Sequence, residues 1–141
     1  MGNMNYEEYK KAHIVDPPPA PRYEFIDSFS VALFFEDYGD AVTYYTEVLG
    51  PPGYVEGEWT RGWKIHKGWL TLLKGKDGGP KNVEIIFDVA TPTEAEKLQA
   101  AFIAAGGQGD APSDQLMYHP VRYCPVTDPF GTEILVISAL E

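Results

Sequence analysis

The fold is decided by residues 31–50, which read VALFFEDYGDAVTYYTEVLG. The β-branched and aromatic residues that run from Phe25 to Phe35 predict a largely buried strand. Asp37 then stands where a helix cap is expected, and apolar residues follow it at spacings of three and four. Gly50, which precedes two prolines, ends this pattern. The stretch therefore predicts a strand followed by an amphipathic helix.

Short runs punctuated by glycine come next and predict antiparallel strands at residues 54–59, 62–66 and 69–73. The second half of the chain repeats this order. Residues 83–89 predict a strand, and Thr91-Pro92-Thr93-Glu94 is a capping box with which a helix begins. Two more strands are predicted at 121–126 and 134–137. The chain thus consists of two similar halves, each with a strand, a helix and further strands.

A helix that follows the first strand of such a sheet can cover only one of its faces. Two curved sheets of this kind, joined edge to edge, would leave a concave trough, and troughs of that kind bind small molecules. Residues 1–24 differ in composition, because Asp16-Pro17-Pro18-Pro19-Ala20-Pro21 favours an extended polyproline segment. We expect residues 1–24 to form an arm, and residues 25–141 to form a single domain.

The chain is strongly acidic, with 21 acidic against 11 basic residues and a net charge of −10. This charge repels polyphosphate and excludes nucleic acid as an expected partner, whereas a cationic or neutral ligand fits better. Acidity can equally serve solubility alone. Residues 59–81 hold six bases and one acid, which indicates either a local positive patch or a solvated hairpin face. No apolar stretch suits a membrane helix and no signal peptide is recognised, so we expect a cytoplasmic protein without membrane contact.

The order of these motifs resembles the vicinal oxygen chelate superfamily, which includes glyoxalase I, bleomycin-resistance proteins and extradiol dioxygenases. The resemblance covers the chain from about Phe29 to Ser138. In the first half it rests on a strand that ends at Asp37 and on a helix with the aromatic pair Tyr44-Tyr45, which ends at Val48-Leu49-Gly50. In the second half it rests on the turn before the last strand, Asp128-Pro129-Phe130-Gly131-Thr132-Glu133.

The resemblance implies an α+β fold in which two βαβββ modules form a curved mixed sheet with a central cleft and with helices on its outer face. The modules would span about residues 27–78 and 82–139. It also implies a homodimer. Whether the modules pair within one chain or between two subunits stays open.

Metal-binding members of the superfamily hold a divalent ion on histidine and carboxylate side chains of the strands. The corresponding positions here are Ser30, Thr71, Glu84 and Leu135. Only Glu84 among these could ligate strongly, so we expect no metal and no other cofactor, and whether the protein is an enzyme stays open. The alternative is a metal-dependent lyase, isomerase or dioxygenase with a rearranged site made of Glu84, Glu133 and His66.

Side chains expected to face the cleft, together with nearby aromatic residues, form the predicted ligand-binding set: Ser30, Ala32, Phe34, Trp63, Trp69, Thr71, Glu84, Ile86, Tyr123 and Leu135. No catalytic residue is predicted. Mostly apolar walls with aromatic rings suit flat or cationic ligands. We therefore expect a glyoxalase/bleomycin-resistance-like protein that binds a small aromatic or cationic molecule in the cleft. An interaction module, whose proline-containing arm recruits a partner, is a third possibility.

Overall fold

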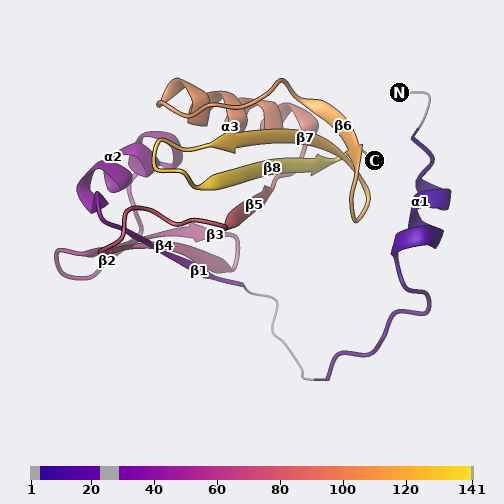
Figure 1. Cartoon of the computed structure of the whole chain (residues 1–141), viewed down its shortest axis with the longest axis horizontal. Helices are drawn as coiled ribbons and strands as arrows, with labels where there is room; N and C mark the ends of the chain where they lie inside the picture. The colour runs from indigo at the N-terminus through magenta and orange to yellow at the C-terminus, as the bar shows by residue number, and fades with distance from the viewer. Residues whose placement is uncertain (1–3, 23–28, 141) are drawn as a thin grey trace.

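The computed structural model of the chain describes residues 4–22 and 29–140. A short helix, α1 (Tyr6–His13), precedes two modules that have the same order of elements (Figure 1). The first module contains β1 (Val31–Phe35), α2 (Tyr38–Leu49), β2 (Tyr54–Val55), β3 (Thr60–Ile65) and β4 (Gly68–Lys74). The second contains β5 (Glu84–Asp88), α3 (Pro92–Ala104), β6 (Ser113–Leu116), β7 (Pro120–Thr127) and β8 (Glu133–Ala139). The predicted α+β fold of two βαβββ modules is confirmed.

Each module forms one four-stranded mixed sheet. Sheet A has the strand order β1-β4-β3-β2 and sheet B the order β5-β8-β7-β6. In both sheets the first strand of the module runs parallel to the last, and the other neighbours are antiparallel. No strand of sheet A is hydrogen-bonded to a strand of sheet B within the described residues. Part of the strand predicted at 25–35, residues 25–28, lies outside the described part of the chain.

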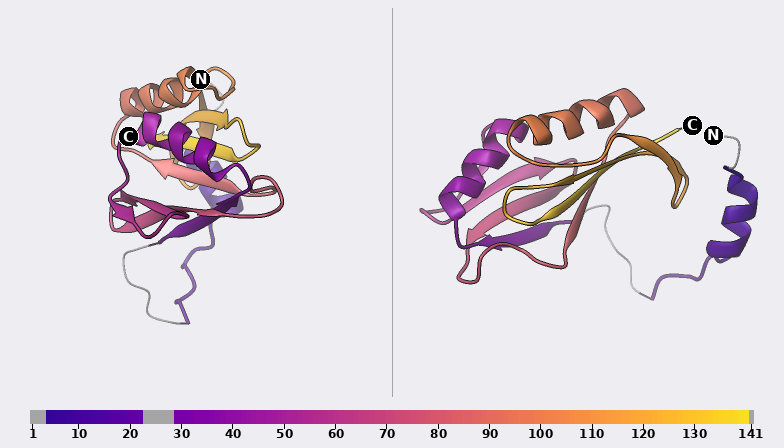
Figure 2. Two further views of the ribbon diagram at one scale, coloured as in Figure 1. Left: turned by 90° about the vertical axis from the view of Figure 1, so that its left-hand side faces the viewer. Right: turned by 45° about the horizontal axis from the view of Figure 1, so that its top comes forward.

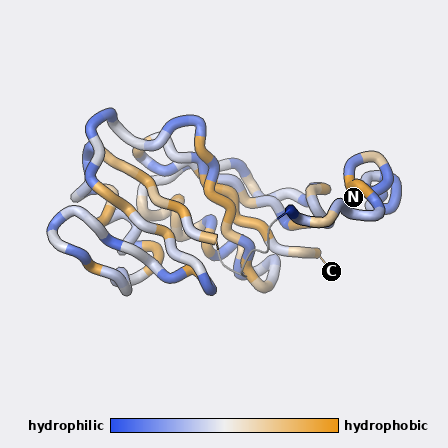
Figure 3. Tube along the Cα trace, turned by 90° about the horizontal axis from the view of Figure 1, so that it is seen from below, coloured by the Kyte–Doolittle hydropathy of each residue, from blue (hydrophilic) through white to orange (hydrophobic). Residues whose placement is uncertain are grey.

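One face of each sheet is packed against helices, and the other faces away from them, although on sheet B it also carries a small buried cluster of Val121, Leu135 and Ile137. In β1, Leu33 and Phe35 are buried, whereas Ala32 and Phe34, which alternate with them, are exposed. The same alternation occurs in β5 (Glu84–Asp88), because successive side chains of a strand point to opposite faces. The hydrophobic residues gather along the strands and the hydrophilic ones at the turns (Figure 3). We call the two surfaces of each sheet the helix-side face and the open face.

The two modules share one hydrophobic core, and helix α2 contacts both of them (Figure 2). The Tyr44 hydroxyl of α2 donates to the Phe102 carbonyl of α3 at 2.8 Å. The Tyr45 hydroxyl donates to Asp128 Oδ2, in the turn between β7 and β8, at 2.7 Å. Burial, and secondly the Asp128 carboxylate, raise the pKa of Tyr45 above its usual range. The aromatic pair and the aspartate turn noted in the sequence therefore join the two modules.

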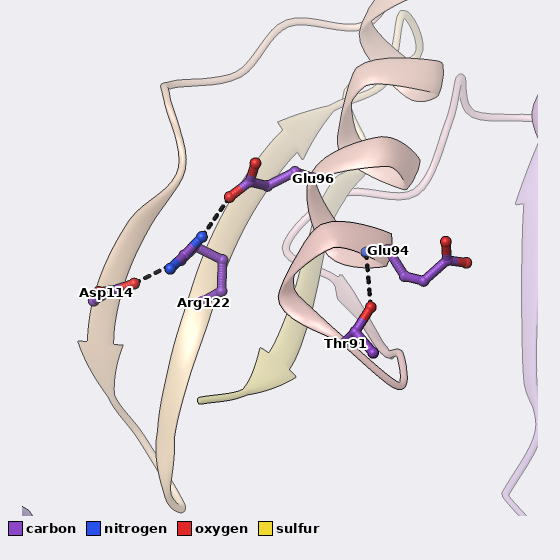
Figure 4. Close-up of polar contacts among 5 residues, drawn as sticks. All are labelled: Thr91, Glu94, Glu96, Asp114 and Arg122. Carbon is purple, nitrogen blue, oxygen red and sulfur yellow. Dashed lines mark hydrogen bonds and ion pairs between the residues drawn. The ribbon is translucent and has the colours of Figure 1, made fainter. Parts of the chain in front are cut away.

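Helix α3 is fixed to sheet B by its cap and by an ion-pair network (Figure 4). Thr91 Oγ1 accepts a hydrogen bond from the Glu94 amide at 3.1 Å, as the capping box predicts. Arg122 of β7 pairs with Glu96 of α3 and, at 2.6 Å, with Asp114 of β6. This network ties the helix to two strands, and its carboxylates raise the pKa of Arg122 further.

The composition of the N-terminal arm predicts an extended segment at residues 16–21. The structure adds a helix before it, α1 (Tyr6–His13). Asn5 caps this helix, since its Oδ1 accepts from the Glu8 amide at 3.1 Å. The Tyr6 hydroxyl donates to the Tyr118 carbonyl at 2.9 Å. Figure 1 shows α1 standing apart from the modules, near the turn between β6 and β7. Among the described helices, none is long and apolar enough to cross a bilayer.

Candidate functional site

Three small residues form a row across the open face of sheet A. Gly62 of β3 pairs with Thr71 of β4, and Thr71 pairs with Ala32 of β1. A Cβ atom added at Gly62 would lie 3.3 Å from Tyr54 Cβ, 3.4 Å from Thr71 Oγ1 and 3.5 Å from Trp69 Cε3. Gly62 is thus buried beneath these side chains, and a larger residue at this position would press against them. We call the row Gly62–Thr71–Ala32 the furrow.

Larger side chains border the furrow on both sides. Phe34 and Leu73 pair across β1 and β4 on one side, and Phe34 is 55% exposed. Trp69 lies on the other side, where its amide donates to Ser30 Oγ at 3.0 Å. Tyr54 closes the end toward β2, with its ring centroid 6.1 Å from that of Trp69 and the two planes at 62°. The furrow therefore has aromatic walls and a polar floor atom, Thr71 Oγ1.

A cation stands beside these aromatic rings. Lys64 pairs with Trp69 across β3 and β4, and its Nζ lies 5.1 Å from the centre of the Trp69 ring. The Tyr54 hydroxyl donates to the Glu56 carboxylate at 2.7 Å, which raises the pKa of Tyr54. The basic side chain is thus held over an aromatic surface, as cation–π pairs are.

The open face of sheet B has a different character. Its centre is apolar, with Ile86 45% exposed beside the buried Leu135. Glu84 and Glu133 pair at one end of this row, and Asp88 lies on the same face of β5. A cavity of about 410 Å³ adjoins the Glu133 end. Carboxylates therefore dominate the charge of this face.

The structure divides the predicted ligand-binding residues between the two open faces. Sheet A carries Ala32, Phe34, Trp69 and Thr71, with Ser30 just before β1, and sheet B carries Glu84, Ile86, Tyr123 and Leu135. Trp63 lies instead on the helix-side face, where it is 3% exposed and donates to the Gly50 carbonyl at 2.8 Å. The sequence prediction did not include Tyr54, Gly62 or Lys64, although the alternation of side chains along β3 places Gly62 and Lys64 on one face.

The donors present do not fit a divalent metal site. In residues 4–22 and 29–140, no group of three or more histidine, cysteine, aspartate and glutamate side chains could hold an ion. Ser30 Oγ is engaged with the Trp69 amide, and Leu135 offers no donor. His66 lies at the turn between β3 and β4 with a φ of 53°, and no such group joins it to the carboxylates of sheet B. One or two carboxylates without such partners make a poor site for a transition metal.

Solved structures similar to this fold include two glyoxalase/bleomycin resistance proteins and an integron cassette protein. A glyoxalase/bleomycin resistance protein from Albidiferax ferrireducens T118 is 17% identical, with a TM-score of 0.63, over 77% of this chain and 95% of that chain. A glyoxalase/bleomycin resistance protein/dioxygenase family enzyme from Burkholderia phytofirmans PsJN is 19% identical, with a TM-score of 0.62, over 79% and 97%. An integron cassette protein from the Halifax Harbour sewage outfall metagenome is 21% identical, with a TM-score of 0.65, over 81% and 99%.

No protein-family model matches the sequence, and no curated protein matches it significantly. The three structural matches span nearly the whole of the solved chains. In this chain the arm with α1 lies outside the two modules. The chain has the fold of the glyoxalase/bleomycin-resistance proteins, as its resemblance to the vicinal oxygen chelate superfamily predicts.

Proposed function

We propose that the protein binds a small aromatic or cationic molecule on the open faces of its sheets, without a resident metal ion. The observation that carries this proposal is the furrow of sheet A with its aromatic walls. Ligand sites are mostly apolar and contain a few well-placed polar groups, and Trp69, Tyr54 and Thr71 supply both kinds of surface. Two proteins of similar structure are described as glyoxalase/bleomycin resistance proteins, which supports the same class of function.

Sheet B supplies the features that would attract a cation. Glu84, Asp88 and Glu133 share its open face with the apolar Ile86. The whole chain adds to this effect, since a net charge of −10 raises the local concentration of cations. The proposal therefore covers ligands that are aromatic, cationic or both.

Isothermal titration calorimetry tests the proposal with planar aromatic amines such as 2-naphthylmethylammonium. We expect saturable heat that weakens in Glu84→Gln and not in Glu47→Gln, a matched change of an exposed residue on α2. If a panel of aromatic amines and aromatic acids gives no heat with folded protein, the proposed function is wrong.

The proposal includes a homodimer, with the ligand held in a groove between the open faces of its two copies. Phe34 and Ile86, which lie on the open faces of the edge strands β1 and β5, are 55% and 45% exposed in one chain. Lys64 on sheet A and the carboxylates on sheet B also have opposite charges, so sheet A of one copy suits sheet B of another. In sedimentation velocity experiments, Ile86→Lys should shift the protein toward monomer, whereas the exposed helix variant Ile103→Lys should not.

A further inference from the structure

A pocket lies between α1 and the turn that joins β6 to β7, away from the surfaces on which the proposed function rests. Its volume is about 250 Å³. The arm contributes Tyr9, His13 and Ile14 to its lining, and the turn contributes Met117 and Tyr118. Figure 1 shows α1 beside this turn. Residues from opposite ends of the sequence therefore meet around one hollow, which we call the arm pocket.

Both sides of the arm pocket are held in place. On the turn side, Met117 packs against the buried cluster on the open face of sheet B. On the arm side, the Tyr6 hydroxyl donates to the Tyr118 carbonyl at 2.9 Å, which fixes α1 against the turn. Because a helix of eight residues is marginal on its own, its contacts with the turn matter. A molecule that touches both sides of the pocket would add to them.

The walls of the arm pocket favour an aromatic occupant. The rings of Tyr9 and His13 are 4.5 Å apart, with their planes at 51°, and together form one wall. Tyr118 is 71% exposed, so much of its surface is free for contact. Aromatic rings stack on one another or meet edge to face, and the Met117 thioether also contacts rings favourably. A ring in the pocket would thus meet suitable partners on both sides.

Size and charge narrow the class of ligand. An engineered apolar protein cavity of about 150 Å³ holds benzene, so a pocket of about 250 Å³ suits one ring or two fused rings. The lining contains no lysine, arginine, aspartate or glutamate. The charged residues Glu7, Lys10, Lys11 and Asp16 of the arm line a different hollow. An ion in the arm pocket would lose hydration without gaining a charged partner, which is unfavourable.

We propose that the arm pocket binds a neutral aromatic molecule of one or two rings, which packs against Tyr9, Tyr118 and Met117. This site is separate from the one in the proposed function, because its walls come from the arm and the turn. The proposal also gives the arm a role, since α1 completes a site that the two modules do not form alone.

The methyl signal of Met117 tests this inference in the full chain, labelled isotopically at its methionine methyl groups. Met117 is one of three methionines in the chain, and it lines the pocket. NMR titration with indole should shift its signal saturably. Indole-3-carboxylate and tryptamine add a negative and a positive charge to the same ring system, and each should bind about fivefold more weakly or worse.

Two substitutions remove rings from the walls. Tyr9→Ala and Tyr118→Ala should each weaken indole binding about two- to tenfold. Tyr118→Ala keeps the backbone carbonyl that accepts from Tyr6, and neither side chain belongs to a hydrophobic core cluster, so the fold is preserved. Tyr54→Ala, at a 44% exposed position on sheet A, is the matched control and should leave indole binding unchanged.

The outcomes separate this inference from the proposed function. If indole leaves the Met117 signal in place, the inference is wrong. If the shift persists with equal affinity in Tyr9→Ala, indole lies on the neighbouring open face of sheet B, so the inference is wrong and the proposed function stands. If tryptamine binds more tightly than indole, the neutral ligand class is wrong. Saturable indole binding that both tyrosine substitutions weaken supports the inference, whatever 2-naphthylmethylammonium shows at the open faces.

Discussion

Asp128 is the residue on which the joint between the two modules depends. It is 4% exposed, and its carboxylate accepts from the Tyr45 hydroxyl and from the amides of Phe130 and Thr132. Asp128→Ala should lower the free energy of unfolding by about 3 kcal/mol or more, because three donors lose their acceptor. Tyr45→Phe removes one donor and should cost about 1 kcal/mol. Urea unfolding measures both, and a smaller loss for Asp128→Ala than for Tyr45→Phe would contradict this reading.

Tyr45 also makes stability depend on alkaline pH. Burial and Asp128 raise its pKa in the folded chain, whereas the unfolded side chain ionises near its ordinary value of 10.0. The stabilising effect is complete below that value and is lost as pH rises toward the folded pKa, because the unfolded state then binds fewer protons. The expected slope is about 1.4 kcal/mol per pH unit for this tyrosine. Urea unfolding of the native chain and of Tyr45→Phe should converge as pH rises above 10.0; parallel curves would disprove the coupling.

At the scale of elements, the segment after α3 is held against the edge of β7 by close backbone contact. A Cβ atom at Gly109 would lie 2.1 Å from the Pro125 carbonyl oxygen. The buried Gln99 of α3 donates to that same oxygen and to the Asp110 carbonyl. Gly109→Ala should therefore destabilise the protein by more than about 2 kcal/mol. Gly39→Ala, where an added Cβ meets nothing within 4 Å, is the control, and equal thermal unfolding of the two variants would refute the prediction.

The sequence predicts those helices and strands whose buried side chains give a regular spacing of apolar residues. For α3, the start predicted by the capping box is confirmed, and the helix buries Ala95 and Phe102 fully and Leu98 in part. Strand β6 is not predictable in this way, because the polar segment SDQL at the edge of sheet B lacks apolar alternation. The same holds for α1, whose stability comes from its Asn5 cap and charges rather than from a buried face.

For the whole molecule, the order of the two modules is predictable and their mutual packing is not. The repeated pattern of strand, helix and strands predicts both sheets. It does not predict that Tyr45 reaches Asp128, since that contact joins residues 83 positions apart. The candidate site is predicted in part, because the alternation of side chains along each strand indicates that Ala32 and Thr71 lie on the open face. Strand register brings them into line with Gly62, and register follows from packing that no local pattern encodes.

The central claim is that a small molecule binds to the open faces of the sheets. Amide chemical shifts of the isotope-labelled chain, followed by NMR during titration with 2-naphthylmethylammonium, test it most directly. The account predicts saturable shifts at Glu84, Ile86 and Trp69 on the open faces, with little change around Arg122 on the helix-side face of sheet B. Shifts confined to Arg122 and its partner Glu96, with none on the open faces, would contradict it.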